Sequence, residues 1–306
     1  MLTRFVGPFV LTVLTIASGR AYGQEGRTFS MPQSVLLFDS PDYELRVITG
    51  NSIQVFRPPA KQGPFYLPAL SSDGARLAWG VPIGVTPKGE RGHFVLGVSP
   101  TAQQQWKTYG DFEEVGSAAF SPDGSRVAFT AVETGGGRVF LILNLASGEL
   151  EALRQLSAVA VQAKLGWSPD GMRLVVEVQR SEKTPAISVV DLTTHDMKAI
   201  GEGENPSWSP TGEWIAYFDA KGEKCTVAHP DGTNARVVRD LDRNVLQYRM
   251  FVHGAVWSPD GTQLLLNEVK GEGPKIDVML LDLASGKVTR KSKDGLPVFG
   301  WVAERR

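Results

Sequence analysis

Short apolar runs alternate with clusters of Gly, Pro, Ser, Asn and Asp along most of the chain. Five of these runs begin directly after a Gly: residues 75–79 (ARLAW), 125–129 (SRVAF), 172–178 (MRLVVEV), 213–218 (EWIAYF) and 262–267 (TQLLLN). Short runs bounded by turn residues are typical of β-strands. An uninterrupted helical period appears nowhere beyond the first residues, so the pattern predicts an all-β protein.

A pentapeptide precedes each of these runs. It reads LSSDG at 70–74, FSPDG at 120–124, WSPDG at 167–171, WSPTG at 208–212 and WSPDG at 257–261, with starts 50, 47, 41 and 49 residues apart. In a type I turn, Ser suits the first position, Pro fixes φ at the second and Gly suits the fourth. We therefore expect the aspartates to form turns and the tryptophans to pack between sheets: Asp73, Asp123, Asp170 and Asp260, and Trp167, Trp208, Trp257 and Trp301.

Two further strands are expected after each of these hairpins. Third strands are predicted in 93–99, 138–147, 186–194, 224–232 and 276–286, and short fourth strands in 149–153, 197–200, 235–239 and 287–291. Four strands in a repeat of about 40 to 50 residues are typical of a β-propeller blade.

The two ends of the chain complement each other. Trp301 lies 44 residues after Trp257, as one more first strand would, whereas 34–40, 43–49 and 52–56 resemble second, third and fourth strands. We predict a six-bladed β-propeller with four antiparallel strands per blade, closed by the C-terminal strand joining the N-terminal strands. Such closure removes the open sheet edges that invite aggregation.

The WSPDG turns, the strands that follow them and hairpins such as 281–286 (LDLASG) resemble the WD-repeat-like propeller repeat of the TolB-like family. The resemblance covers essentially the whole chain after residue 23, and it implies a propeller. It is poorly specific for function, because similar repeats occur in the propellers of prolyl-oligopeptidase-type peptidases and in many secreted proteins. The first blade needs the residues between 24 and Leu70, so we expect the propeller to occupy 24–306.

The N-terminus resembles a secretory leader. Arg4 precedes an apolar stretch from Phe5 to Ala17, and the small residues Ala21 and Gly23 suit a cleavage site. A membrane anchor is the alternative, but the apolar stretch is shorter than the roughly 20 residues that span a bilayer. We expect a signal peptide at 1–23, a periplasmic or secreted protein and no stable membrane span after cleavage.

Composition and motifs give little sign of catalysis. The 306 residues carry a net charge of −1, which argues against nucleic acid as a partner, and the single cysteine, Cys225, is expected to be buried in a strand. There is no G-x-S-x-G motif and no histidine pair with metal-ligand spacing. The stretch 240–244 (DLDRN) lacks the later Gly and Glu of a calcium loop. We therefore expect no cofactor, no metal and no catalytic residue.

Three long segments offer a candidate binding surface: 81–92, 107–115 and 242–253. We expect them to be loops around the channel mouth, on the face away from the pentapeptide turns. Aromatic residues and Arg are enriched in interface hot spots. The candidate binding residues are Tyr109, Phe112, Tyr248, Arg249 and His253.

The leading hypothesis is an exported, non-enzymatic propeller that serves as a binding module or scaffold for a protein partner in the cell envelope. One alternative is a propeller enzyme, either a metal-assisted lactonase-like hydrolase or a polysaccharide lyase. Another is a carbohydrate-binding module. Fold alone does not decide among them, because propellers support many functions.

Overall fold

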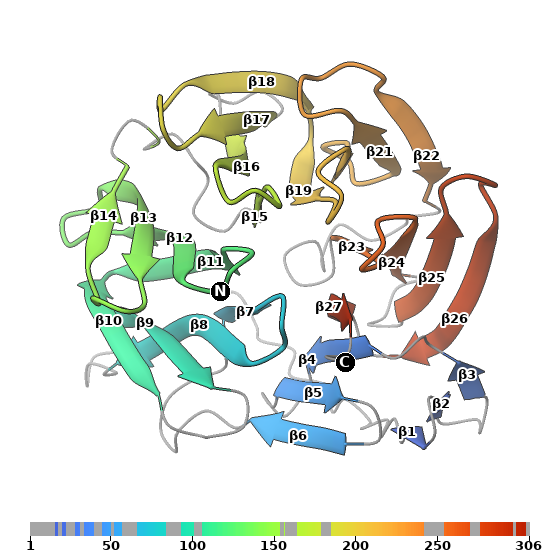
Figure 1. Ribbon diagram of the computed structural model, residues 1–306, viewed down its shortest axis with the longest axis horizontal. Coiled ribbons are helices and arrows are strands. Elements are labelled where there is room, and N and C mark those ends of the chain that lie inside the picture. Colours follow the sequence, from blue (N-terminus) through green and yellow to red (C-terminus); the bar gives the residue numbers. More distant parts are fainter. Residues whose placement is uncertain are drawn as a thin grey trace, which may run out of the picture.

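The computed structural model describes six short strand segments near the N-terminus: 16–17, 20–22, 28–30, 34–39, 45–49 and 52–56. After these it describes residues 66–83, 93–100, 106–153, 156, 164–178, 185–241, 254–269, 276–295 and 298–303. Four-stranded antiparallel sheets stand around a common centre, with the first strand of each nearest to that centre (Figure 1). The prediction of an all-β protein with four antiparallel strands per sheet is confirmed.

Five of the sheets contain a pentapeptide turn between their first two strands, and the strands follow one another in chain order. The first sheet has β7 (Tyr66–Leu70), β8 (Arg76–Ile83), β9 (His93–Pro100) and β10 (Lys107–Phe112). The second has β11 (Glu114–Phe120), β12 (Arg126–Val132), β13 (Arg138–Asn144) and β14 (Leu150–Ala152). The third has β15 (Leu165–Trp167), β16 (Arg173–Val178), β17 (Ala186–Asp191) and β18 (Met197–Glu202). The fourth has β19 (Glu204–Trp208), β20 (Ile215–Phe218), β21 (Lys224–Ala228) and β22 (Arg236–Asp240). The fifth has β23 (Ala255–Trp257), β24 (Gln263–Val269), β25 (Ile276–Asp282) and β26 (Val288–Gly295).

A further sheet contains segments from both ends of the chain. β27 (Val298–Ala303) pairs antiparallel with β4 (Ser34–Asp39), and β5 (Leu45–Thr49) and β6 (Ser52–Phe56) follow in that order. Trp301 lies opposite Leu36 in this register. A small sheet of β1 (Ile16–Ala17), β2 (Arg20–Tyr22) and β3 (Thr28–Ser30), which the sequence pattern does not indicate, precedes it.

The pentapeptide turns have the geometry that their residues favour. In the third sheet, Gly171 donates its N–H to the carbonyl of Ser168 at 2.9 Å and has a φ of 68°. The Ser168 hydroxyl donates to the Asp170 carboxylate and accepts the N–H of Arg173 at 2.9 Å, while Asp170 accepts the N–H of Met172 at 2.9 Å. The prediction that the aspartate is a turn residue is therefore confirmed.

Tryptophans that precede the turns lie between neighbouring sheets. Trp167 is buried and donates its indole N–H to the carbonyl of Ala119, in the second sheet, at 3.0 Å. Trp257 is buried as well and donates to the carbonyl of Ser207, in the fourth sheet, at 3.2 Å. Each bond joins one sheet to the sheet before it, as the expected packing role requires.

The hydrophobic core consists of clusters that lie between adjacent sheets. One cluster combines Leu96 and Phe112 of the first sheet with Phe129 and Leu143 of the second. A later cluster includes Cys225, which is fully buried in β21, as expected from the sequence.

The expectation that 107–115 is a loop at the channel mouth is wrong. Residues 107–112 form β10, the outermost strand of the first sheet, and 114–120 form β11, the first strand of the second sheet. Most side chains of β10 are exposed, so its sequence lacks the apolar alternation of a half-buried strand. Gly110 has a φ of 73° and lies within an irregularity of the β9–β10 pairing, which interrupts the strand pattern further.

Candidate binding pocket

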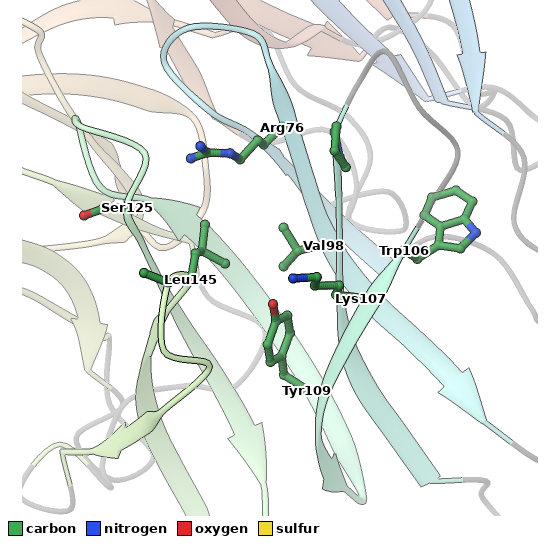
Figure 2. A pocket seen from close by; sticks show the side chains of 9 residues that line it. Arg76, Val98, Trp106, Lys107, Tyr109, Ser125 and Leu145 are labelled. Atoms are coloured by element: carbon green, nitrogen blue, oxygen red, sulfur yellow. The ribbon is translucent and has the colours of Figure 1, made fainter.

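A pocket of about 590 Å³ lies between the first two pentapeptide-containing sheets (Figure 2). The residues that line it are Arg76, Val98, Pro100, Trp106, Lys107, Tyr109, Ser125, Leu145 and Ala146. Arg76 and Ser125 stand at the turns that join first to second strands, and Leu145 and Ala146 follow a third strand. In an antiparallel sheet these connections share one end, so the pocket opens at the end that carries the pentapeptide turns.

Arg76 is the first residue of β8, and its side chain crosses to the second sheet. Its Nη1 donates to the carbonyl of Gly124, in the turn of that sheet. Arg126 occupies the same place in the next repeat and donates from Nη2 to the carbonyl of Gly171 at 2.9 Å. The arginine that begins a second strand therefore joins its sheet to the next, which fixes the guanidinium of Arg76 at the pocket.

Lys107 and Tyr109 come from β10. Residues two apart in a strand point to the same face, and both side chains line the pocket, with the Lys107 amine directed toward the sheet that carries Leu145 (Figure 2). Tyr109 is partly buried against the core cluster of the two sheets. Trp106, at the pocket edge, makes an edge-to-face contact with the buried Trp79, with ring centroids 4.5 Å apart.

The facing wall is held by backbone hydrogen bonds. Leu145 donates its N–H to the carbonyl of Ser125 at 3.0 Å. Ala146 donates its N–H to the side-chain carbonyl of Asn144 at 2.9 Å. Because these bonds fix the hairpin after β13, the wall keeps its shape without a ligand.

The charged residues that line the pocket all carry positive charge. Arg76 and Lys107 are cationic, and none of the described residues that line the pocket is acidic. Val98 and Leu145 supply apolar surface, and Tyr109 supplies a ring with a polar tip. Such a site suits an anionic group attached to an apolar body. Among the described residues, no group of three or more His, Cys, Asp or Glu side chains could hold a metal ion.

The structure separates the predicted binding residues. It places Tyr109 in the pocket, but it buries Phe112 at 6% exposure, edge to face with Phe129 at 5.7 Å. Phe112 therefore packs in the core and does not offer its ring to a partner, which corrects the expectation for that residue. Tyr248, Arg249 and His253 lie outside the described residues, as does the segment 84–92.

Sequence reasoning missed Arg76 and Lys107. Arg76 could have been found, because an arginine follows the turn serine by five residues in three repeats, as Arg76, Arg126 and Arg173. Lys107 had no such signal, because the fourth strand that carries it was not recognised. In the described part of the chain, no helix is long and apolar enough to cross a membrane.

Comparison with known proteins identifies the repeat. The family model described as the TolB beta propeller domain matches residues 39–241. A TolB homolog of Chlorobium luteolum is 29% identical over 168 residues, which are 54% of this chain and 36% of that relative. The uncharacterized peptidase YuxL of Bacillus subtilis is 28% identical over 123 residues, which are 36% of this chain and 18% of that relative. The chain thus matches only a minor part of each relative's length.

Solved structures show the same fold. TolB from Acinetobacter baumannii has a TM-score of 0.66 at 14% identity, covering 89% of this chain and 66% of that one. An oligogalacturonate lyase in complex with manganese has a TM-score of 0.55 at 16% identity, covering 86% of this chain and 73% of that one. At these identities the likeness concerns the fold alone.

Proposed function

This chain belongs to the TolB β-propeller domain family, and from that premise we propose that it is a non-enzymatic binding module for a protein partner in the cell envelope. The observation that carries the proposal is the preformed pocket between the first two pentapeptide-containing sheets. Its lysine and its tyrosine belong to β10, an outermost strand with mostly exposed side chains. Tyr and Arg are residues that interfaces use as anchors.

The proposed architecture is a six-bladed propeller closed by its C-terminal strand. Support comes from the sheet in which β27 pairs with β4 beside β5 and β6, because it has the same four-stranded order as the five pentapeptide-containing sheets. We further propose that residues 1–23 are a signal peptide and that 24–306 form the periplasmic propeller. Cleavage after Gly23 would remove β1 and β2, and N-terminal sequencing of the protein from the envelope fraction tests this.

Site-specific photocrosslinking in intact cells of the source tests the binding proposal. A photoreactive phenylalanine analogue replaces Tyr109 in the full chain, and a matched control carries it at Lys198, an exposed residue of β18. We expect one envelope protein, identified by mass spectrometry, to crosslink at position 109 and not at position 198. The proposal is wrong if the products from the two positions are the same or if no protein product forms.

A propeller enzyme is the second candidate, either a polysaccharide lyase or a metal-assisted hydrolase, and a carbohydrate-binding module is a related one. The observation in favour is the fold shared with a manganese-bound oligogalacturonate lyase. Metal analysis of the purified chain, followed by lyase and hydrolase assays with and without added Mn²⁺, tests this candidate. Stoichiometric metal together with turnover would replace the binding module as the leading function.

A further inference from the structure

The residues that line the pocket have counterparts in other pentapeptide-containing sheets. Arg76 is the fifth residue after the serine of its turn, and the residues at the same place in the next three repeats are Arg126, Arg173 and Trp214. The fourth-strand residue at the place of Lys107 is identified by its partner on the third strand. Lys107 pairs with Val98, Lys198 pairs with Val189 and Arg236 pairs with Val227, so these three fourth-strand residues correspond. The junctions can therefore be compared residue by residue.

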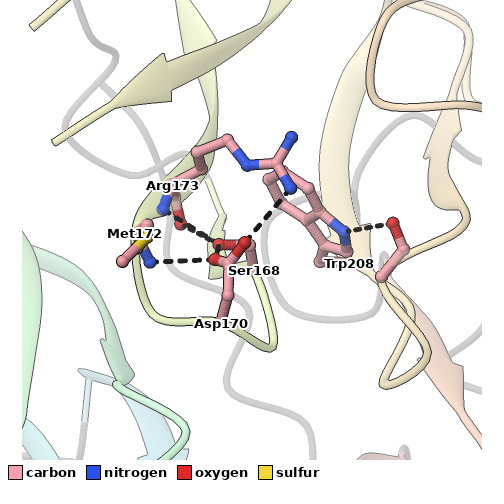
Figure 3. Close-up of polar contacts among 6 residues, drawn as sticks. Ser168, Asp170, Met172, Arg173 and Trp208 are labelled. Atoms are coloured by element: carbon pink, nitrogen blue, oxygen red, sulfur yellow. Dashed lines mark hydrogen bonds and ion pairs between the residues drawn. The ribbon is translucent and has the colours of Figure 1, made fainter. Parts of the chain in front are cut away.

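At the junction after the third sheet, the arginine has carboxylates of its own chain beside it. Arg173 lies 3.3 Å from Asp170 and opposite Asp191 in the strand pairing (Figure 3 shows the Asp170 contact). Backbone hydrogen bonds from Thr194 and Thr193, together with the charge of Arg173, lower the pKa of Asp191. Asp191 is thus held as an anion next to Arg173.

At the pocket, Asp73 corresponds to Asp170, but no carboxylate corresponds to Asp191. Pro100 stands opposite Arg76, where Asp191 stands opposite Arg173. Arg76 and Lys107 share a pocket whose described lining includes no acid. Two like charges in one pocket favour an anion as its occupant.

At the junction after the fourth sheet, a flat ring takes the place of Arg76. The Trp214 indole lies 4.4 Å from the His229 ring, and the guanidinium of Arg236 stands 5.6 Å from the indole centroid. The Nη2 of Arg236 also donates to the carbonyl of Leu283, on the next sheet, at 3.5 Å. Leu283 corresponds to Leu145 of the pocket, so this junction accommodates an aromatic ring beneath a cation.

We propose that the pocket binds a carboxylate of a peptide segment of the partner, with an aromatic or large apolar side chain next to that carboxylate. The inference rests on the proposed function and names the group that is recognised. Lys107 and Arg76 donate to the carboxylate, and hydrogen bonds between ionised groups are the stronger ones. Tyr109, Val98 and Leu145 contact the ring, and the peptide extends along the exposed face of β10.

Titration of the full chain with short peptides tests the proposal, followed by NMR of the Trp106 indole N–H, which a Trp106→Phe variant assigns. The probes are acetyl-Leu-Tyr with a free carboxylate, its C-terminal amide, acetyl-Asp-Tyr-amide and trigalacturonate. We expect the free carboxylate to bind about tenfold more tightly than its amide, because a hydrogen bond to a charged group has about this value. Tighter binding of acetyl-Asp-Tyr-amide than of acetyl-Leu-Tyr assigns the carboxylate to a side chain, and weaker binding assigns it to a chain end.

Two matched variants locate the effect. Lys107→Gln should remove most of the difference between acid and amide, whereas Lys198→Gln, at the corresponding position of β18, should leave it unchanged. The proposal is overturned if acid and amide bind equally, if no peptide binds, or if both variants act alike. Tighter, Lys107-dependent binding of trigalacturonate than of any peptide overturns it in favour of an acidic sugar.

The two proposals can fail separately. A protein that crosslinks at position 109 while acid and amide peptides bind equally would leave the binding module standing without the carboxylate pocket. Carboxylate-dependent peptide binding without a crosslinked protein would leave the pocket chemistry standing without the envelope partner.

Discussion

Asn267 holds both backbone groups of Val298. Its Nδ2 donates to the Val298 carbonyl at 2.9 Å, and its Oδ1 accepts the Val298 N–H at 3.0 Å. Both residues are buried, and Asn267 lies in β24 whereas Val298 begins β27. A side-chain amide therefore pairs with the C-terminal strand as a neighbouring strand's backbone would.

The same position makes a similar contact elsewhere. Asn267 is the ninth residue after the turn serine Ser258, and Glu177 is the ninth after Ser168. Glu177 accepts the N–H of Asn205, at the start of the next sheet, at 3.0 Å. In these two repeats, the side chain at this position thus joins a second strand to the first strand of the following sheet.

Replacing Asn267 with Ala should destabilise the fold. Two buried backbone groups of Val298 would lose their partners, and an unsatisfied buried group costs about 1–3 kcal/mol. Urea unfolding of the full chain measures the change, and Gln263→Ala on the same strand is the control. If the two variants unfolded at the same urea concentration, the Asn267–Val298 pair would contribute nothing measurable.

Glu177 should make stability fall as pH rises. Burial raises its pKa above the ordinary value of 4.5, although the hydrogen bond from Asn205 opposes this. Between 4.5 and the folded-state pKa the folded chain binds more protons than the unfolded chain, so stability decreases with pH across that window.

Glu177→Gln keeps an acceptor for Asn205 without a charge. We expect its stability advantage over the original chain to grow from about pH 4.5 and to level off above the folded-state pKa. Unfolding at several pH values from acid to neutral measures this, with the exposed Glu202→Gln as the control. An advantage that does not change with pH would contradict the role assigned to burial.

Asp123 should make stability rise with pH, whereas Glu177 should make it fall. Hydrogen bonds from the Ser121 hydroxyl and from Ser125 lower its pKa from 3.8 to about 2. Its stabilising effect is present above 3.8 and is lost as pH falls toward 2. Because the carboxylate is exposed, Asp123→Asn should cost no more than about 1 kcal/mol at neutral pH, and the gap should close on acidification. A gap that is constant from neutral pH to the acid end, measured by urea unfolding, would rule this out.

Arg126 should matter for the junction between the second and third sheets. It donates to the carbonyl of Gly171 at 2.9 Å and lies 4.7 Å from the Trp167 ring centroid. Arg126→Leu removes both contacts and should cost about 1–2 kcal/mol. Arg126→Lys should recover part of this, and the exposed Arg138→Leu is the control. Thermal unfolding distinguishes the variants, and no difference between the two leucine variants would contradict the contact.

The repeats were predictable because their signals are local. Ser168, Asp170 and Gly171 form a turn from hydrogen bonds within a few residues, so the sequence alone indicates it. The strand β10 was not predicted because an outermost strand with exposed side chains has no alternation of apolar and polar residues. The pocket was not predicted because Arg76, Lys107 and Leu145 lie at three different strand ends, and only the packing of two sheets brings these ends together.

Substitution of Pro100 tests whether the absence of an acid opposite Arg76 determines what the pocket binds. If the pocket binds carboxylates because Pro100 replaces the acid found at Asp191, then Pro100→Asp should supply that acid from within the chain. The new carboxylate would lie opposite Arg76 and compete with the ligand, so binding of acetyl-Leu-Tyr should weaken about tenfold. Pro100→Asn is the matched control, because Asn144 occupies this place opposite Arg126 and adds no charge. Titration by NMR measures both variants, and equal binding by them would show that the missing carboxylate does not determine what the pocket recognises.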